Sequence, residues 1–152
     1  MSTTLNNSRT AVTESSRDIP VAADVDVLVV GGGPAGLGAG IAAARQGTVT
    51  LVVERNGFLG GVATAALMSI FLNHRERLNG ISREIVEEVL RRKGGVAGRV
   101  ISFDPEVFKE VALDFLLDAG AKLLLYSWAA RPILDEGAVR GIIIENKSGR
   151  EA

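Results

Sequence analysis

The chain has 152 residues, of which 47% are hydrophobic and 23% charged, enough to bury the core of one domain. Seventeen basic and eighteen acidic residues leave a formal charge of −1 without a basic stripe, which argues against nucleic acid and membrane partners. Cysteine is absent and His74 is the single histidine, so we predict no disulfide, no thiolate chemistry and no metal site within this stretch.

The first part of the chain is polar and then becomes glycine-rich. Residues 1–23 lack hydrophobic periodicity and an apolar leader, so we expect a disordered extension, a cytoplasmic location and an ordered domain over 24–152. The uncharged stretch 27–44 is long enough to suggest a membrane helix, but its glycines and Pro34 indicate a strand, a turn and a helix.

The first elements predicted form one βαβ unit. β-Branched runs predict strands over 25–30 and 48–53, and a helix over 34–46, ended by Gly47, lies between them. A loop is expected over 55–79, with an apolar stretch at 62–72 that begins a helix. The unit has the usual length of about 30 residues.

Two amphipathic helices come next. We expect the first over 82–93, capped by Ser82 and ended by Gly94, with a solvated face of paired charges. The second begins at Pro105 with Asp104 as its cap, and it ends at Gly120.

The last third predicts strands. They cover 121–128, 132–134 and 139–145, and turns are expected at 135–137 and 146–149. The chain stops two residues after the second turn, where a returning strand is expected, which favours an N-terminal fragment.

A glycine motif stands at the first strand-to-helix turn. Residues 31–36, Gly-Gly-Gly-Pro-Ala-Gly, satisfy G-x-G-x-x-G in the setting that dinucleotide binding requires. Gly31 permits the tight turn, Gly33 lets the backbone meet a pyrophosphate, and Gly36 lets the helix pack closely on the strand. Pro34 and Ala35 begin the helix whose N-terminus would face the phosphates.

An acidic residue ends the next strand. Glu54 lies 23 residues after Gly31, where a carboxylate can accept hydrogen bonds from a ribose hydroxyl, the alternative being an exposed charge at a strand end. Arg55 is a further candidate for the cofactor, with a solvated charge as the alternative.

These residues resemble the FAD-dependent oxidoreductases of the two-dinucleotide-binding-domain flavoprotein group. The resemblance covers about residues 24–152 and rests on 26–37, Glu54-Arg55, 60–64 (Gly-Gly-Val-Ala-Thr) and 103–150. It implies an α/β fold, a Rossmann-like FAD/NAD(P)-binding domain with a central parallel sheet and a small β-meander, and FAD as the cofactor. It further implies that Gly60 and Gly61 lie along the cofactor phosphates and that backbone near Ala129 contacts the adenine.

The resemblance also implies that the protein continues beyond residue 152. Members of the family have a further cofactor-contacting strand and a substrate domain, so we expect this chain to be truncated and its active site incomplete. No Cys pair stands after Gly61, which excludes the disulfide-reductase branch.

The sequence therefore predicts the FAD-binding N-terminal part of an oxidoreductase that acts on an unidentified small molecule. The alternatives are an NAD-dependent dehydrogenase domain, which uses the same glycines and Glu54, and a non-catalytic nucleotide-binding fragment. His74 is a proton-donor candidate or a surface residue, and Tyr126 and Trp128 either stack on adenine or pack on the sheet. The sequence indicates neither the catalytic residues nor the oligomeric state.

Overall fold

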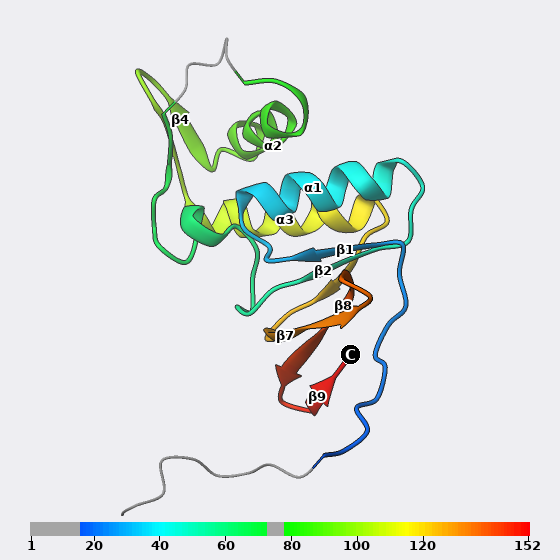
Figure 1. Cartoon of the computed structure of the whole chain (residues 1–152). Helices are drawn as coiled ribbons and strands as arrows, with labels where there is room; N and C mark the ends of the chain where they lie inside the picture. Colours follow the sequence, from blue (N-terminus) through cyan, green and yellow to red (C-terminus); the bar gives the residue numbers. More distant parts are fainter. Residues whose placement is uncertain (1–15, 73–77) are drawn as a thin grey trace, which may run out of the picture.

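The computed structural model describes residues 16–72 and 78–152, which form three small sheets and three helices (Figure 1). The helices are α1 (Pro34–Arg45), α2 (Gly80–Arg91) and α3 (Pro105–Asp118), and a 3₁₀ turn covers Gly61–Ala63. The strands are β1 (Val27–Val30), β2 (Thr50–Val53), β3 (Ile70–Phe71), β4 (Gly95–Ala97), β5 (Ile101–Phe103), β6 (Lys122–Leu124), β7 (Trp128–Asp135), β8 (Ala138–Asn146) and β9 (Gly149–Glu151).

The central sheet is parallel, with the strand order β1-β2-β6 and with Val29 opposite Val52. Helices α1 and α3 cover one face of this sheet, and the antiparallel strands β7, β8 and β9 lie on its other side (Figure 1). The predicted βαβ unit, the parallel sheet and the β-meander are therefore confirmed, as is the α/β fold class.

The core lies between the helices and the central sheet. Leu37 and Ile41 of α1, Val52 of β2 and Leu116 of α3 are each at most 1% exposed. A Cβ on Gly40 would lie 2.6 Å from Val52 Cγ2 and 3.2 Å from Leu116 Cδ1, so this glycine lets α1 approach both neighbours. The close approach fixes where the first turn of α1 stands relative to the sheet.

The start of α3 is as predicted. The Asp104 side chain accepts a hydrogen bond from the Glu106 N–H at 2.8 Å, Pro105 is the first helical residue, and the Phe103 and Phe108 rings pack with centroids 5.1 Å apart. Gly120, with φ +87°, stands just after the end of the helix. Local signals were sufficient here because the capping Asp104, the proline at the first helical position and the hydrophobic staple formed by Phe103 and Phe108 all favour the same start.

The predicted cap of α2 is wrong. The helix begins two residues earlier with Asn79 as its N-cap, so Ser82 lies in the first turn and its hydroxyl donates to the Asn79 carbonyl at 2.8 Å. The helix also ends before Lys93, because that residue takes a left-handed φ of +59° and the Gly94 N–H returns to the Val89 carbonyl at 2.9 Å.

The charged face of α2 pairs as expected and also reaches the neighbouring helices. Glu88 accepts from Arg91 and Arg92 at 2.6 and 2.7 Å on the same helix. Glu84 binds Arg45 of α1 at 2.7 Å, and Arg92 binds Asp114 of α3 at 2.7 Å. These ion pairs join α2 to α1 and α3 at the surface.

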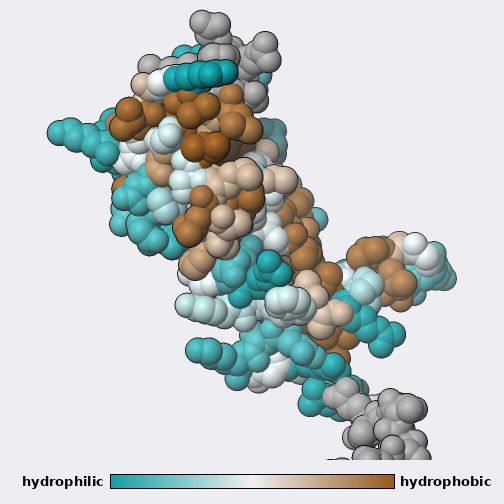
Figure 2. Space-filling view, turned by 90° about the vertical axis from the view of Figure 1, so that its left-hand side faces the viewer, coloured by the Kyte–Doolittle hydropathy of each residue, from teal (hydrophilic) through white to brown (hydrophobic). Residues whose placement is uncertain are grey.

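The small sheet β3-β5-β4 was not predicted from the sequence. The stretch 62–72, expected to begin a helix, instead holds part of the 3₁₀ turn and then β3, which pairs with β5. Runs of two or three residues carry too little periodicity to identify such strands. Leu67, Leu72 and Val96, in or beside these strands, are exposed apolar side chains. Figure 2 shows hydrophobic surface in the upper part of the molecule.

The strand expected over 121–128 is divided in two. β6 ends at Leu124, Tyr126 takes a φ of +53°, and Trp128 begins β7 in a different sheet. The left-handed residue turns the chain away from the central sheet, so Tyr126 and Trp128 do not share a strand face as expected. The strand predicted to return after the second turn is β9.

The ends of the described chain lie together. Ala22 N–H donates to the Ala152 carbonyl at 2.7 Å, and Ala152 N–H donates to the Pro20 carbonyl at 2.8 Å. Residues 1–15 and His74 lie outside the described residues. Within 16–72 and 78–152, no helix is long and apolar enough to span a membrane.

Candidate nucleotide-binding site

The glycine-rich loop lies at the carboxyl end of β1. Gly31 has a φ of +102°, and its N–H donates to the Val53 carbonyl at 2.7 Å, which holds the turn against β2. A Cβ on Gly36 would overlap the Gly31 carbonyl oxygen, so the first turn of α1 contacts the loop backbone directly. The roles expected of Gly31 and Gly36, a tight turn and close packing, agree with this geometry.

The second glycine pair packs onto this loop. The Gly60 N–H donates to the Gly32 carbonyl at 2.8 Å, and Gly60 and Gly61 both have positive φ, +108° and +50°. A Cβ on Gly61 would lie 2.8 Å from the Gly33 Cα, so only a glycine permits this approach. Two segments about thirty residues apart therefore form one surface made of backbone.

The N-terminus of α1 is available to an anion. Its N-cap, Gly33, has no side chain to accept from the first-turn amides, and the first turn contains no acidic residue. The N–H groups of Ala35 and Gly36 have no intrahelical acceptor by helix geometry, and the helix dipole adds positive potential there. This arrangement suits a phosphate or pyrophosphate group.

Glu54 lies beneath the loop and is 5% exposed. Its Oε2 accepts the Gly32 N–H at 2.6 Å, and its Oε1 accepts both the backbone N–H and the side-chain amide of Asn56 at 2.8 Å. The alternative of an exposed charge at a strand end is therefore wrong for Glu54. Charge-assisted bonds of this kind hold the carboxylate in one orientation.

A cavity of about 230 Å³ opens at the carboxyl ends of β1 and β2. Its lining comprises Val30, Gly31, Val53, Glu54, Arg55, Ser127, Trp128 and Ala129. The Ser127 N–H donates to the Glu54 carbonyl at 3.0 Å, which fixes the start of β7 beside β2. Ala129, expected near the adenine, therefore shares this cavity with Gly31 and Glu54.

Arg55 and Trp128 form one wall of the cavity. The Arg55 guanidinium carbon lies 5.4 Å from the centroid of the Trp128 ring, within the range of a cation–π contact, and Trp128 is 56% exposed. A flat, partly exposed aromatic ring in such a cavity suits an adenine ring. Tyr126 does not line this cavity; a Cβ on Gly57 would overlap its hydroxyl.

A second cavity of about 400 Å³ lies beside the glycine pair. It shares Glu54 and Arg55 with the first cavity and adds Gly61, Val62 and Ala65. The structure thus brings together the predicted residues Gly31, Gly33, Pro34, Ala35, Gly36, Glu54, Arg55, Gly60, Gly61 and Ala129 around the loop and its two adjoining cavities.

Sequence reasoning missed Asn56 and Ser127 and left Trp128 open. Asn56 follows the acid by two residues and offers both a backbone N–H and a side-chain amide, so its position after Glu54 is the signal that could have identified it as a donor to that carboxylate. No comparable signal identifies Ser127, whose contact depends on the long-range position of β7.

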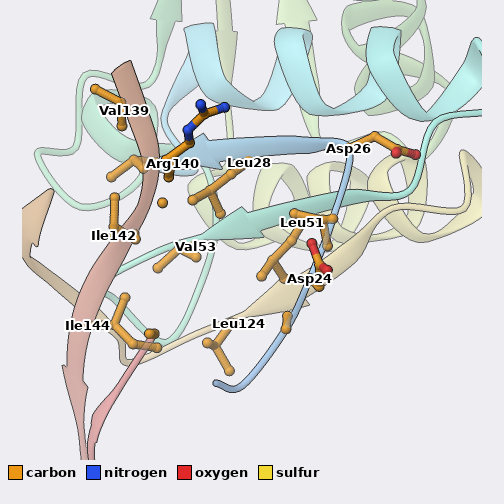
Figure 3. Close-up of a pocket in the computed structure, with 15 residues that line it drawn as sticks. Asp24, Asp26, Leu28, Leu51, Val53, Leu124, Val139, Arg140, Ile142 and Ile144 are labelled. Atoms are coloured by element: carbon orange, nitrogen blue, oxygen red, sulfur yellow. The ribbon is translucent and has the colours of Figure 1, made fainter. Parts of the chain in front are cut away.

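A further cavity of about 370 Å³ lies between the central sheet and β8. Figure 3 shows Leu28, Leu51 and Val53 of the sheet facing Ile142 and Ile144 across it. Asp26, at its margin, accepts the Val49 N–H at 2.8 Å, and Arg140 pairs with Asp135 at 3.5 Å. The apolar lining offers few converging groups for a nucleotide, so we place the candidate site at the glycine loop.

The fold and this site define a Rossmann-like dinucleotide-binding domain. Residues 26–152 match the model of the family described as FAD dependent oxidoreductase. The chain belongs to this family, whose cofactor is FAD, and the resemblance found in the sequence is confirmed.

Curated relatives agree with this assignment. The chain is 31% identical over 136 residues to a thiamine thiazole synthase of Methanococcus vannielii, covering 85% of this chain and 49% of that protein. It is 32% identical over 139 residues to digeranylgeranylglycerophospholipid reductase 1 of Methanopyrus kandleri, covering 83% of this chain and 36% of that protein. The chain thus spans half or less of the length of these two relatives.

Solved structures show the same fold. Thermovibrio ammonificans THI4 matches with a TM-score of 0.56 and 24% identity, over 82% of this chain and 48% of that one. A geranylgeranyl bacteriochlorophyll reductase-like protein of Thermoplasma acidophilum matches with a TM-score of 0.59 and 23% identity, over 88% of this chain and 37% of that one.

Proposed function

We propose that this chain binds the ADP moiety of FAD and forms the N-terminal, cofactor-binding part of an oxidoreductase that acts on a small molecule. The pyrophosphate lies against the loop at Gly31–Gly33 and the first turn of α1, and Glu54 accepts from the ribose. The adenine occupies the cavity beside Ala129, with Arg55 and Trp128 as its wall. When bound, FAD supplies the redox chemistry, and this chain binds and orients it.

The observation that carries the proposal is the contact between the two glycine segments. Gly61 approaches the Gly33 Cα so closely that no other residue fits, and the two segments leave backbone rather than side chains facing the start of α1. A cofactor with a pyrophosphate needs such a surface because its charged oxygens must come within hydrogen-bond distance of N–H groups.

The glycine pair also favours FAD over NAD as the ligand. The resemblance to flavoproteins places such a pair along the phosphates of FAD, whereas ordinary NAD dehydrogenases lack it. The family match supports the same cofactor. Binding of NAD in place of FAD is an outcome that the experiment distinguishes.

The experiment is to mix the purified chain with FAD, pass it over a gel-filtration column and record the flavin absorbance of the protein peak. FMN, which lacks the adenosine half, and NAD⁺ are tested in parallel by calorimetry. We expect FAD to be retained and FMN to bind at least about tenfold more weakly, because the described contacts all serve the ADP half. A colourless protein peak with no calorimetric FAD binding would contradict the proposal.

A pair of variants at the N-cap and inside α1 sharpens this test. In Gly33→Val a side chain would occupy the space of the pyrophosphate, while a Cβ there meets nothing nearer than the Gly61 Cα at 3.8 Å. Gly38→Ala is the matched control, because a Cβ on Gly38 meets nothing within 4 Å. We expect only Gly33→Val to lose FAD, with both variants folded by circular dichroism.

A further inference from the structure

The carboxylate of Glu54 has only one hydrogen-bond position left for a ligand. A carboxylate offers about four acceptor positions, two on each oxygen. Both positions of Oε1 are taken by the backbone N–H and the side-chain amide of Asn56, at 2.8 Å each. The Gly32 N–H takes one position of Oε2 at 2.6 Å, so among the contacts of residues 16–72 and 78–152 the single position without a donor is on Oε2.

These partners are themselves held in place. The Asn56 carbonyl accepts the Tyr126 N–H at 3.1 Å, and the Glu54 carbonyl accepts the Ser127 N–H at 3.0 Å. On the other side, the Gly32 carbonyl accepts the Gly60 N–H at 2.8 Å. Because Glu54 is 5% exposed, rotating its carboxylate to present both oxygens would break charge-assisted bonds at a largely buried position.

We propose that Glu54 contacts only one of the two ribose hydroxyls of the ADP moiety, and that Asn56 enforces this by occupying Oε1. The inference rests on the proposed function and concerns the specificity of the same site. A carboxylate that binds a vicinal diol with both oxygens needs a free position on each, and this one has a free position on Oε2 alone. Asn56 is accordingly a positioning residue that acts through Glu54.

The consequence is that removal of the 2′-hydroxyl and removal of the 3′-hydroxyl of ADP should change the binding affinity unequally. Removal of the contacted hydroxyl leaves the last position of a buried carboxylate without a donor, and we expect affinity to fall roughly tenfold or more. Removal of the other hydroxyl takes no partner from Glu54, so the affinity should change less than about threefold, within the range of a solvent-facing hydrogen bond.

The experiment measures the binding of ADP, 2′-deoxy-ADP and 3′-deoxy-ADP to the whole chain by isothermal titration calorimetry. Trp128, the single tryptophan of the chain and a wall of the cavity, supplies an independent fluorescence readout. Loss of affinity for one deoxynucleotide alone supports the proposal. Equal losses for both would show a carboxylate that binds the diol with two oxygens, and no loss for either would show that Glu54 does not contact the ribose; both outcomes overturn it.

Asn56→Ala tests the positioning role. The variant frees one position on Oε1, so the ribose hydroxyl that Glu54 does not contact in the unchanged chain should gain a partner. Removal of that hydroxyl should then lower the affinity of the variant about fivefold or more. A merely structural role would weaken all three nucleotides equally and leave their ratios unchanged, which would refute the assignment to Asn56. If Asn56→Ala does not fold, Asn56→Leu, which is closer to asparagine in size and also lacks a side-chain donor, is tested for the same ratios.

Asn146→Ala is the matched control. The Asn146 amide also donates to a carboxylate, Glu151 Oε2 at 2.6 Å, but at the turn between β8 and β9, and it lines neither cavity of the site. We expect the nucleotide ratios of this variant to equal those of the unchanged chain. Failure of the unchanged chain to bind ADP and FAD refutes the proposed function as well, whereas ADP binding with both hydroxyls equally required refutes this inference alone.

Discussion

Replacement of Gly36 by alanine should destabilise the fold through one contact. A Cβ at this position would overlap the Gly31 carbonyl oxygen and would lie 3.0 Å from the Gly31 carbonyl carbon and 3.3 Å from Val29 Cγ1. Carbon atoms in ordinary contact are about 3.5–4.0 Å apart, so the contact with the Gly31 carbonyl carbon alone requires a separation of roughly 0.5 Å. The overlap with the Gly31 oxygen is tighter still, so α1 and the loop must separate by more than this. Neither partner can yield easily, because Gly31 also donates to the Val53 carbonyl.

The cost of this substitution is set by close packing. Forcing an extra carbon into a packed interior typically costs about 1–3 kcal/mol, and here it meets backbone rather than a mobile side chain, so we expect the upper part of that range. For a chain of this size, 1 kcal/mol corresponds to roughly 2–4 °C in Tm. Gly36→Ala should therefore lower the Tm, measured by circular dichroism, by about 5 °C or more.

Gly38→Ala, on the same helix, provides the opposite expectation. A Cβ at Gly38 meets nothing within 4 Å, and alanine is favoured over glycine inside a helix by about 0.5–1 kcal/mol, so this variant should be as stable as the unchanged chain or more stable. A Gly36→Ala variant that melts with or above Gly38→Ala would refute the reasoning that Gly36 sets the distance between helix and loop.

The remaining predictions concern binding, acid stability and the core. Glu54→Gln should weaken ADP binding about tenfold or more and lower the Tm, since its amide nitrogen would face an N–H of Gly32 or Asn56; unchanged calorimetry and melting would contradict this. Hydrogen bonds from Arg91 and Arg92 lower the pKa of Glu88 from 4.5 to about 2. The stability this gives is complete above pH 4.5 and is lost as the pH falls toward 2, so Glu88→Gln should flatten the fall in urea-unfolding midpoint over that window, and an unaltered slope would refute the assignment. Leu37→Ala, in a side chain 1% exposed, should cost about 2–5 kcal/mol in urea unfolding, and a smaller loss would show that the core refills the space.

The sequence predicted well wherever local chemistry decides the structure. The turn at Gly31, the helix at Pro34 and the capped start of α3 each depend on residues within one turn of one another, and all are present. The sequence predicted poorly where distant pairing decides. Strand β3 forms because β5, about thirty residues later, offers it a partner. Tyr126, just after β6, turns the chain away from the central sheet through a backbone conformation that its residue type does not indicate.

The candidate site also contains residues that the sequence could predict and residues that it could not. Its glycines and Glu54 could be identified because each answers a requirement of a bound dinucleotide that spacing alone expresses. Asn56 answers instead a requirement of Glu54: a carboxylate left 5% exposed needs donors for its oxygens whether or not a ligand is present. If Glu54 binds the ribose as proposed, the partners that satisfy this buried charge also determine how much of it the ribose can use, so the same hydrogen bonds would serve both folding and ligand specificity.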